Sequence, residues 1–572
     1  MHIGKNIHFF SFFSDLASYK AKYFKRDLFS AFTVALLAIP QSIAYSILAG
    51  LPPVAGLYSA IFGTLFCSVF CSSRHLVSGP TTAIAILIQS SVSDILTDHY
   101  GTSYTDENVL MVLTHLVFTI GVIQIGVSFL NIEKILQFIS RSVILGYFAG
   151  VALAIFINQL YPLLGIGALQ GDYSVFVRAV HLLKELDTFS LATVSLGLIS
   201  LLSIIFVKRR YPKFPGAILV ISGASLLCML PFFQDVAFLQ VEELSLSPKF
   251  VFPFTDFHLF IQAFPSASAI ALLAILEVYS VSRAFGAKSG QNILVNQEMF
   301  AIGTSNLLLS FIYSAMPASG SASRSSLNFQ NGAKTRFSAL LSALIVLGAI
   351  WFAFPLMAFI PIASLAALLI ATVLVIIDFD QVKIALKSTK GDFLAFGLTL
   401  LSCFFFRLDI AFFIGIVISI AFYLKKAAEP HLVEYVFNEK GRLVIVSSKD
   451  DRTVRIIGYA GELFFGVADF FQKTLQTVAE NPSVRVIILR LNGVYHVDAS
   501  ICFALLRLSE YMRATNRHLV ITGVTPEVLE VFKKASIYKQ IGEENFFLTD
   551  EAKPQLSTWL GCLRAKELLS KR

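Results

Sequence analysis

Apolar runs separated by short polar segments fill most of this sequence, from Leu28 to Leu424. A run of about 20 apolar residues is long enough to cross a bilayer as a helix. By this measure the predicted spans are Leu28–Gly50, Val54–Ser72, Thr81–Leu96, Val109–Leu130, Ser142–Leu160, Leu191–Val207, Ala217–Phe232, Phe260–Ser282, Met299–Tyr313, Ser319–Asn331, Phe337–Phe354, Pro355–Ile377, Asp392–Phe406 and Ile410–Leu424. The total is about fourteen, and the eleventh and twelfth spans could be merged or split.

The pattern changes after Pro430. Strand-like segments occur at Leu443–Ser447, Thr453–Gly458, Val484–Leu491 and His518–Thr522, and helical patterns at Ala499–Thr515 and Pro526–Ala535. Strands that alternate with helices indicate a small α/β domain. We therefore expect a cytosolic N-terminal segment (residues 1–27), a transmembrane domain (28–427) and a cytosolic C-terminal domain (428–572).

Composition agrees with a membrane protein. An ordinary soluble protein carries about 25% charged residues, whereas 14% of these 572 residues are charged and 56% are hydrophobic. The net charge of +8 does not indicate a nucleic-acid partner, because the basic residues are spread over short loops. The six cysteines include no CxxC pair, so no redox or zinc site is expected.

The charges of the loops predict the orientation. Basic residues of one side are Lys20, Lys22, Lys25, Arg26, Arg74, Lys134, Arg141, Lys208, Arg209, Arg210, Arg283, Lys288, Lys334, Arg336, Lys383, Lys387, Lys425 and Lys426, and the opposite loops are bare or acidic. Because cytoplasmic loops are enriched in lysine and arginine, we expect both termini in the cytoplasm and an even number of spans. The expected location is the bacterial inner (cell) membrane.

The stretch Met316–Lys334 carries the strongest chemical signal. It lies between apolar spans, yet it contains five serines, two glycines and Arg324. Irregular backbone at membrane depth is tolerated only where protein buries it or where it lines a watery cavity. A half-helix that starts with Gly320, Ser321 and Ser323 offers free N–H groups and hydroxyls beside a fixed positive charge, which suits an anion. The alternative is a polar loop in which Arg324 is only a topology signal.

A second Ser-Gly break, Ser78-Gly-Pro-Thr-Thr82, opens the third predicted span as Ser319-Gly-Ser-Ala-Ser323 opens the tenth. These are matching positions in two halves of seven spans. Seven is odd, so the second half would be inverted relative to the first. Paired interruptions of this kind are typical of a transporter's binding site. If the two helix starts face each other, their positive dipole ends converge.

Two further intramembrane residues are candidates for function. Glu277 lies inside the eighth span, where a carboxylate is costly and indicates function. We expect it to carry a proton or bind a coupling cation; alternatively, it is a structural partner of a basic residue such as Arg324. Gln41 follows Pro40 in the first span, and its amide either binds an oxyanion or joins two helices. Tyr45 lies one turn further on the same face.

Other polar residues have plainer interpretations. Arg407 and Asp409 flank the turn before the last span and are predicted to form a surface pair. Asp498 precedes a helix and is predicted to cap it, with a regulatory role as the alternative. No Walker loop, HExxH motif or nucleophile elbow with partners is present. We therefore expect neither an enzyme nor an ATP-driven pump, and no metal or cofactor.

Several motifs stand out together: Pro40–Tyr58, Ser73-Arg74, Ser78–Pro80, Asn296-Gln-Glu298 followed by Gly303, and Ser319–Lys334. They resemble the signature of the sulfate permease family of anion transporters. The C-terminal region looks like a STAS domain. One departure is Ala55, where the family usually has an aromatic residue.

The resemblance implies fourteen spans in two inverted repeats, with spans one to four and eight to eleven as a mobile core and the rest as a gate. It also implies a homodimer whose cytosolic domains contribute contacts. The implied substrate-binding residues are Gln41, Tyr45, Thr81, Thr82, Ser321, Ser323 and Arg324. Ser500 matches the serine phosphorylated in bacterial signalling STAS domains, although Ala499 replaces the usual preceding serine.

From these features we expect the protein to be a secondary transporter that works by alternating access in the lipid bilayer. The expected activity is proton-coupled import of sulfate, with Glu277 as the coupling residue and H⁺ preferred to Na⁺ as the coupling cation. The alternatives are transport of bicarbonate or a dicarboxylate, an uncoupled anion exchanger or channel, and a membrane sensor that signals through its STAS domain.

Overall fold

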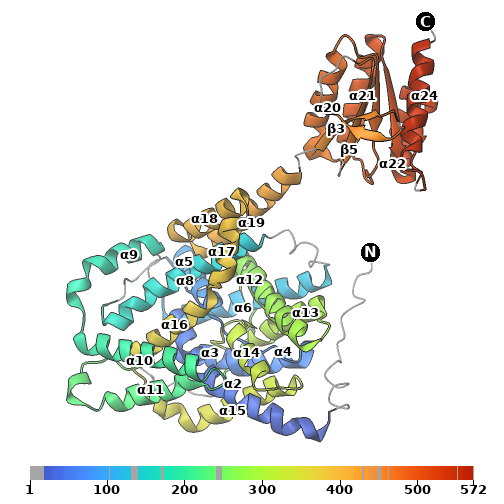
Figure 1. The fold of residues 1–572 in the computed structure, drawn as a ribbon. Helices are drawn as coiled ribbons and strands as arrows, with labels where there is room; N and C mark the ends of the chain where they lie inside the picture. The colour runs from blue at the N-terminus through green and yellow to red at the C-terminus, as the bar shows by residue number, and fades with distance from the viewer. Residues whose placement is uncertain are drawn as a thin grey trace. The chain divides into compact units, whose positions relative to one another are not determined.

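The computed structural model describes residues 19–101, 104–130, 140–167, 169, 173–239, 248–427, 431–439, 441–446, 452–460, 463–550 and 552–570. Its contacts divide the chain into two units, Met1–Ile420 and Ala421–Arg572 (Figure 1). The first unit is built almost entirely of helices, and the second contains a mixed sheet.

The helices of the first unit follow the apolar pattern of the sequence. They are α2 (Ala21–Leu48), α3 (Pro53–Tyr58), the π-helical turn η1 (Ser59–Gly63), α4 (Thr64–Phe70), α5 (Thr82–Tyr100), α6 (Asp106–Phe129), α8 (Arg141–Leu164), α9 (Val175–Lys184), α10 (Leu191–Arg210), α11 (Gly216–Leu227), α12 (Phe257–Ser289), α13 (Val295–Leu309), α14 (Ala322–Gln330), α15 (Phe337–Ala353), α16 (Ile362–Ile376), α17 (Phe379–Ser388), α18 (Lys390–Phe405) and α19 (Leu408–Ala427).

Each predicted span overlaps a helix of the structure. The second span consists of α3, η1 and α4 in succession, and the twelfth contains α16 after the 3₁₀ helix η4 (Phe354–Phe359). Helices α9 and α17, with ten residues each, were not predicted, because neither contains an apolar run of about 20 residues. Among the described residues, seven helices are long and apolar enough to cross a membrane, or eight if the bent pair Ile362–Leu374 and Phe379–Ser388 is one span. The predicted fold class, a helical membrane domain followed by an α/β domain, is confirmed.

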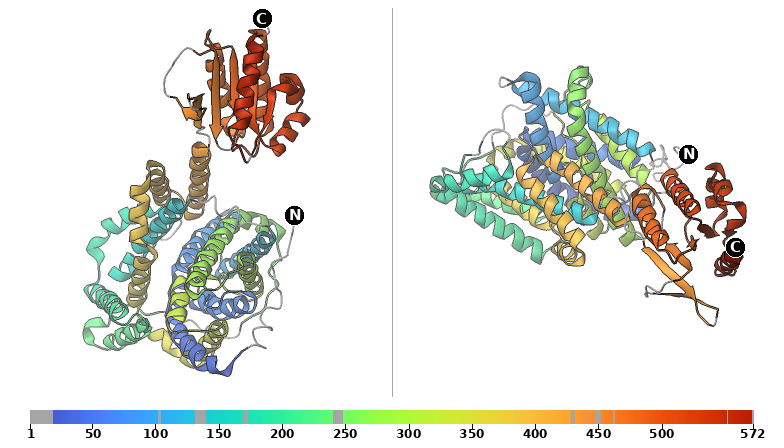
Figure 2. Two further views of the ribbon diagram at one scale, coloured as in Figure 1. Left: turned by 45° about the vertical axis from the view of Figure 1, so that its right-hand side comes forward. Right: turned by 90° about the horizontal axis from the view of Figure 1, so that it is seen from above.

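The first unit contains two groups of helices (Figure 2). Helices α2 to α6 pack against α12 to α15, whereas α8 and α10 pack against α16 and α18. This grouping corresponds to the core and gate that the family resemblance implies. The substrate-binding and coupling residues expected from the sequence all come from the first group, whereas Ser500 lies in the second unit.

Glycines allow α6 and α13 to approach closely. A Cβ atom on Gly121 of α6 would lie 2.5 Å from the backbone nitrogen of Leu307, and one on Gly303 of α13 would lie 2.8 Å from that of Ile125. Small residues at a helix crossing let two backbones come together in a membrane. The close contact holds α13 in place beside the site and gives a physical reason for Gly303 in the family motif.

The second unit contains a six-stranded sheet in the order β4-β3-β5-β6-β7-β8. The strands are β3 (His431–Phe437), β4 (Leu443–Ile445), β5 (Val454–Ala460), β6 (Val486–Arg490), β7 (His518–Val524) and β8 (Phe546–Leu548), and the last four run parallel. The helices are α20 (Phe465–Glu480), α21 (Ala499–Ala514), α22 (Pro526–Lys534), α23 (Ile537–Ile541) and α24 (Leu556–Ser570).

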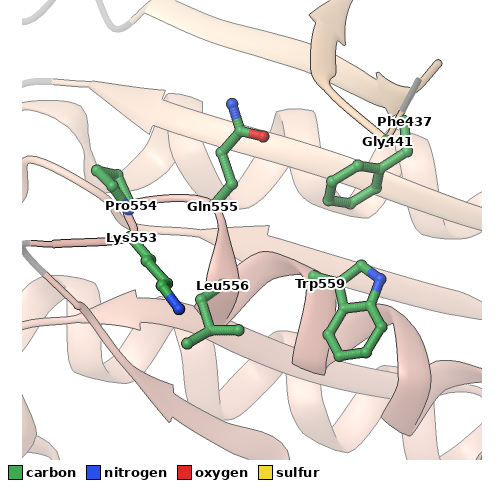
Figure 3. A pocket seen from close by; sticks show the side chains of 7 residues that line it. All are labelled: Phe437, Gly441, Lys553, Pro554, Gln555, Leu556 and Trp559. Carbon is green, nitrogen blue, oxygen red and sulfur yellow. The ribbon is translucent and has the colours of Figure 1, made fainter.

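Alternate residues of the parallel strands face opposite helical layers. Ile487 and Leu519 belong to the core beneath α20 and α21, whereas Val486 and Val520 pack towards α24. Beside the first residues of α24 there is a mainly apolar cavity of about 420 Å³, where the rings of Phe437 and Trp559 lie on opposite sides (Figure 3).

Candidate functional site

The two Ser-Gly breaks meet in the structure. Ser78–Gly79 forms the short strand β1 and Ser319–Gly320 forms β2, and the two pair antiparallel with Ser78 opposite Gly320. Two residues, Pro80 and the N-cap Thr81, separate β1 from helix α5, which begins at Thr82. Helix α14 follows β2 directly, with Ser321 as its N-cap. The structure therefore brings together the starts of two helices that are far apart in the sequence.

Hydrogen bonds across the two breaks fix this arrangement. The N–H of Ser321 donates to the carbonyl of Val77 (3.0 Å), and the N–H of Val77 donates to Oγ of Ser325 (2.9 Å). Asn306 of α13 donates to the carbonyl of Ala318 (3.0 Å) and accepts from its N–H (2.7 Å). Backbone groups inside a membrane need such partners, since no lipid group can replace them.

Arg324 lies at the meeting point and is 0% exposed. One guanidinium nitrogen, Nη2, donates to the carbonyl of Pro80. The other two, Nε and Nη1, have no hydrogen-bond partner among the described residues. Burying an unpaired charge is costly, so the site is electrostatically complementary to an anion.

Gly79 makes room for this guanidinium. A Cβ atom there would lie 2.6 Å from Nη1 and 3.1 Å from Nη2 of Arg324, and the φ of Gly79 is +132°. We expect Gly79→Ala to displace Arg324 and strain β1 by about 1–3 kcal/mol. If sulfate, the anion expected from the sequence, binds here, its stabilisation of the protein in thermal unfolding should weaken. Gly126→Ala is the control, because a Cβ at this helical position meets nothing within 4 Å. If sulfate raised the unfolding temperature equally in Gly79→Ala and Gly126→Ala, Gly79 would not be needed to place the Arg324 guanidinium for anion binding.

Glu277 of α12 joins the two helix starts. Its Oε2 accepts hydrogen bonds from Oγ1 of Thr81 (3.0 Å) and from Oγ of Ser319 (2.6 Å). None of the ion pairs among the described residues includes Glu277. The structure thus does not show the salt bridge to Arg324 that was the alternative interpretation, and it places the carboxylate against two hydroxyls of the site.

The remaining candidates surround the same point. Nε2 of Gln41 lies 3.5 Å from Oγ of Ser323, whereas its Oε1 is buried without a hydrogen-bond partner in the described chain. Oγ of Ser321 accepts the N–H of Arg324 at 3.4 Å and lies 3.4 Å from Oγ of Ser323. The Gln41 amide is therefore close to the start of α14.

Tyr45 extends the site towards the second group of helices. Its hydroxyl lies beside Thr82 and Thr372, and Arg324 and Glu277 are close enough to act on it electrostatically. Thr372 belongs to α16 and was not identified from the sequence. A hydroxyl in a mainly apolar helix, which also contains Ser364, gave no signal that would have distinguished Thr372. The structure thus brings all seven predicted binding residues and Glu277 together.

Glu298, which belongs to the family motif, links neighbouring segments through hydrogen bonds. Its Oε1 accepts from the N–H and the hydroxyl of Ser72 (both 2.6 Å) and from the N–H of Ser73 (2.8 Å), and Oε2 accepts from the hydroxyl of Ser282 (3.2 Å). Four hydrogen bonds satisfy this buried carboxylate. It ties α13 to the end of α4, which leads into β1.

The prediction that Arg407 and Asp409 form a surface pair is wrong in part. The pair forms, at 3.0 Å, but the Asp409 side chain is only 8% exposed and Arg407 also binds Asp94 of α5. The hydroxyl of Ser266 on α12 donates to Asp409 as well (3.3 Å). The network joins Asp94 and Ser266 of the first group to α19, which belongs with the second group because its Gly415 packs against Val143 of α8 and Thr399 of α18. Neighbouring positions in the sequence cannot reveal such a contact.

In the C-terminal unit, Asp498 caps two helices. Its Oδ1 accepts the N–H of Ile501 in α21 (3.1 Å), which confirms the predicted N-cap, and its Oδ2 accepts the N–H of Phe465 at the start of α20 (2.5 Å). Ser500 is the second residue of α21 and is half-buried. Its regulatory role remains a prediction.

We expect Asp498→Ala to destabilise both helix starts, by about 1 kcal/mol for each lost cap. Hydrogen exchange of the full-length protein should become faster near Phe465 and Ile501. The exposed Asp469 of α20 provides the control, since Asp469→Ala removes a carboxylate that caps neither start. Faster exchange at only one of the two starts would contradict the double cap.

Comparisons with known proteins agree with these features. The sequence model of the sulfate permease family matches residues 24–399, and that of the STAS domain matches residues 446–552. "Probable sulfate transporter 4.2" of Arabidopsis thaliana is 28% identical over 553 residues, which cover 92% of this chain and 80% of that protein. "Putative sulfate transporter YvdB" of Bacillus subtilis (strain 168) is 25% identical over 534 residues, with 92% and 97% covered.

Solved structures share the fold. Murine Slc26a9, described as an anion transporter in the inward-facing state, aligns with a TM-score of 0.86 at 20% identity and covers 98% of this chain and 94% of its own. The transmembrane domain of the cyanobacterial bicarbonate transporter BicA aligns with a TM-score of 0.59 at 20% identity, over 70% and 98%. Since the family match spans most of the transmembrane unit, this chain belongs to the sulfate permease family and is a multi-pass membrane protein with a C-terminal STAS domain.

Proposed function

We propose that this protein is a secondary active transporter that imports sulfate together with protons. The observation that carries the proposal is the buried guanidinium of Arg324, two of whose nitrogens lack a hydrogen-bond partner within the described chain. It lies where the starts of α5 and α14 meet, so the two helix dipoles and the arginine all favour an anion at the same point. Relatives described as sulfate transporters support this choice of anion.

Glu277 supplies the coupling in this proposal. A charged carboxylate near the site opposes an anion by Coulomb repulsion, and the repulsion is strong where water is excluded. A proton on Glu277 removes it. Because coupling between two ligands is reciprocal, an anion in the site also favours the protonated carboxyl, and the two would cross the membrane together.

The hydroxyls around Glu277 would take part in the exchange. In the structure, Thr81 and Ser319 donate to the carboxylate. A protonated carboxyl can itself donate a hydrogen bond, which would release a hydroxyl to turn towards the anion. Protonation would thus remove one negative charge and add one donor at the site.

Transport would proceed by alternating access, in which the group α2–α6 with α12–α15 moves past the other group. Closure at one end would involve Arg407, which binds Asp94 on one group and Asp409 on the other. We further propose a homodimer in a bacterial cell membrane with both termini in the cytoplasm, as the basic loops favour. A phosphate on Ser500 would regulate transport, a role that identical uptake by Ser500→Ala and Ser500→Asp would exclude.

The test is uptake of radiolabelled sulfate into proteoliposomes with and without an inward proton gradient. We expect sulfate to accumulate only with the gradient. Exchange or electrogenic flux that ignores the gradient would identify an uncoupled exchanger or channel, and selective uptake of bicarbonate or a dicarboxylate would replace the substrate. Binding without any flux would instead indicate a membrane sensor.

A further inference from the structure

The C-terminal unit contains a second cavity, which is polar and lies away from Ser500. It has a volume of about 180 Å³ and is bounded by the last turns of α21, the turn into β7 and the end of α23. Ser500 is at the first turn of α21, whereas the cavity begins at Ser509 and Arg513 near the other end of this helix. The cavity therefore does not belong to the predicted regulatory serine.

The lining of this cavity is basic. Arg513, Arg517 and His518 contribute to it, together with the buried polar residues Ser509 and Asn545, and none of the residues that line it is acidic. The adjacent Glu544 does not neutralise the cavity, because its carboxylate is paired with Arg564 at 3.3 Å.

The strand register places a third arginine, Arg485, next to Arg517, although Arg485 does not itself line the cavity. Val486 of β6 pairs with His518 of β7, so Arg485 and Arg517 occupy neighbouring positions just before these strands. Side chains alternate along a strand and neighbouring strands lie about 4.8 Å apart. Ile487 and Leu519, two residues further on, face α21. Arg485 and Arg517 are therefore on the face of the sheet that α21 covers.

The ordinary explanation for such arginines is that they balance the carbonyl end of a helix. Arg513 fits it in part, since its Nη2 donates to the backbone carbonyl of Gln540. Arg517 does not fit, because its Nη1 is buried and has no hydrogen-bond partner in the part of the chain that the structure describes. A buried donor on a charged group is costly to leave unpaired, and this one borders the cavity.

We propose that this cavity is a binding site for a tetrahedral oxyanion, such as sulfate or phosphate, held by Arg517 and Arg513. The planar guanidinium presents two parallel N–H groups, which match two oxygens of such an ion. Ser509 offers a hydroxyl, and Nδ2 of Asn545, which already donates to the carbonyl of Ile541 at 2.8 Å, retains a second N–H for another oxygen. The same chemistry is present in the headgroup of an anionic lipid, so the ligand is either a free ion or a lipid phosphate.

The experiment is hydrogen–deuterium exchange of the full-length protein in nanodiscs of phosphatidylcholine, with and without sulfate or inorganic phosphate. We expect either ion to slow exchange in residues 509–519 and 537–545. Protection should persist in Arg324→Ala, which removes the proposed transport site. The experiment therefore tests the cavity in the C-terminal unit independently of the proposed transport function.

Arg517→Gln should lower the affinity for the ion by about tenfold or more, the loss typical of one charged hydrogen bond. Arg507→Gln is the matched control, since Arg507 is an exposed arginine on α21 outside the cavity. Unchanged exchange of β6 and β7 without ligand would show that the variant is folded. Arg513→Gln provides a second test if it is not.

A second arm identifies the source of the ligand. Nanodiscs that contain phosphatidic acid, without free oxyanion, should protect the same residues only if a lipid headgroup is bound. Protection in neither arm, or equal protection of wild type, Arg517→Gln and Arg513→Gln, would overturn the inference.

Discussion

Arg324→Ala is expected to abolish sulfate uptake and sulfate binding. The guanidinium is 0% exposed and has two nitrogens available at the meeting point of two helix starts. Each hydrogen bond from a charged donor contributes about 1.5–3 kcal/mol, so losing two lowers the affinity by about two orders of magnitude or more. Uptake of radiolabelled sulfate and stabilisation of the protein by sulfate measure the two effects.

The same variant should be more stable than the wild type without anion. The alanine removes a buried charge that the fold leaves largely unpaired, and such removals are often stabilising. Wild type should gain stability as sulfate is added, as any ligand of the folded state requires, whereas Arg324→Ala should not. Arg324→Lys, which keeps the charge without the planar fork, should be intermediate. A destabilised variant that still binds sulfate would refute the assignment.

Glu277→Gln is expected to separate anion binding from the proton gradient. Glutamine has nearly the same shape, and its carbonyl oxygen can still accept from Thr81 and Ser319, but it cannot carry a proton. Sulfate should bind with an affinity that no longer depends on pH through this residue. Downhill sulfate exchange should continue, whereas accumulation driven by the gradient should disappear.

Two comparisons make the Glu277 result specific. Ser319→Ala removes one hydrogen-bond donor to the carboxylate and leaves the proton carrier, so gradient-driven accumulation should persist with an altered pH dependence. If Glu277→Gln itself still accumulated sulfate in full response to the gradient, Glu277 would not be the coupling residue. Loss of exchange as well as accumulation would instead indicate a structural requirement.

Much of the site was predictable because its signals are local. Serine and glycine at membrane depth marked both breaks, and Arg324 and Glu277 were conspicuous as charges inside apolar spans. Their pairing across the repeats followed from matching positions in the two halves. The hydrogen-bond partners of individual hydroxyls could not be predicted. Thr81 and Ser319 both donate to Glu277 because the two-residue strands β1 and β2 pair, and no sequence pattern shows that pairing.

Some of the remaining differences between the predictions and the structure arise from contacts between segments that are distant in the sequence. The buried Asp409 accepts from Ser266 and is linked to Asp94 through Arg407, and no sequence pattern relates these positions. In the C-terminal domain β4 to β7 were predicted from their patterns, whereas β3 and β8, with seven and three residues, were missed. Helices α20 and α24 were also missed, although α20 is amphipathic, with Val467 and Phe471 on its buried face.

The pairing of β1 with β2 also affects the speed and selectivity of anion capture. Folding itself already orders both helix starts, because each break is hydrogen-bonded to the other. No backbone segment therefore has to become ordered when an anion binds, and the entropy lost on binding is confined to the ion and a few side chains. Association without a conformational change is fast. Discrimination among anions would then depend on how readily each one sheds its hydration shell at this rigid point.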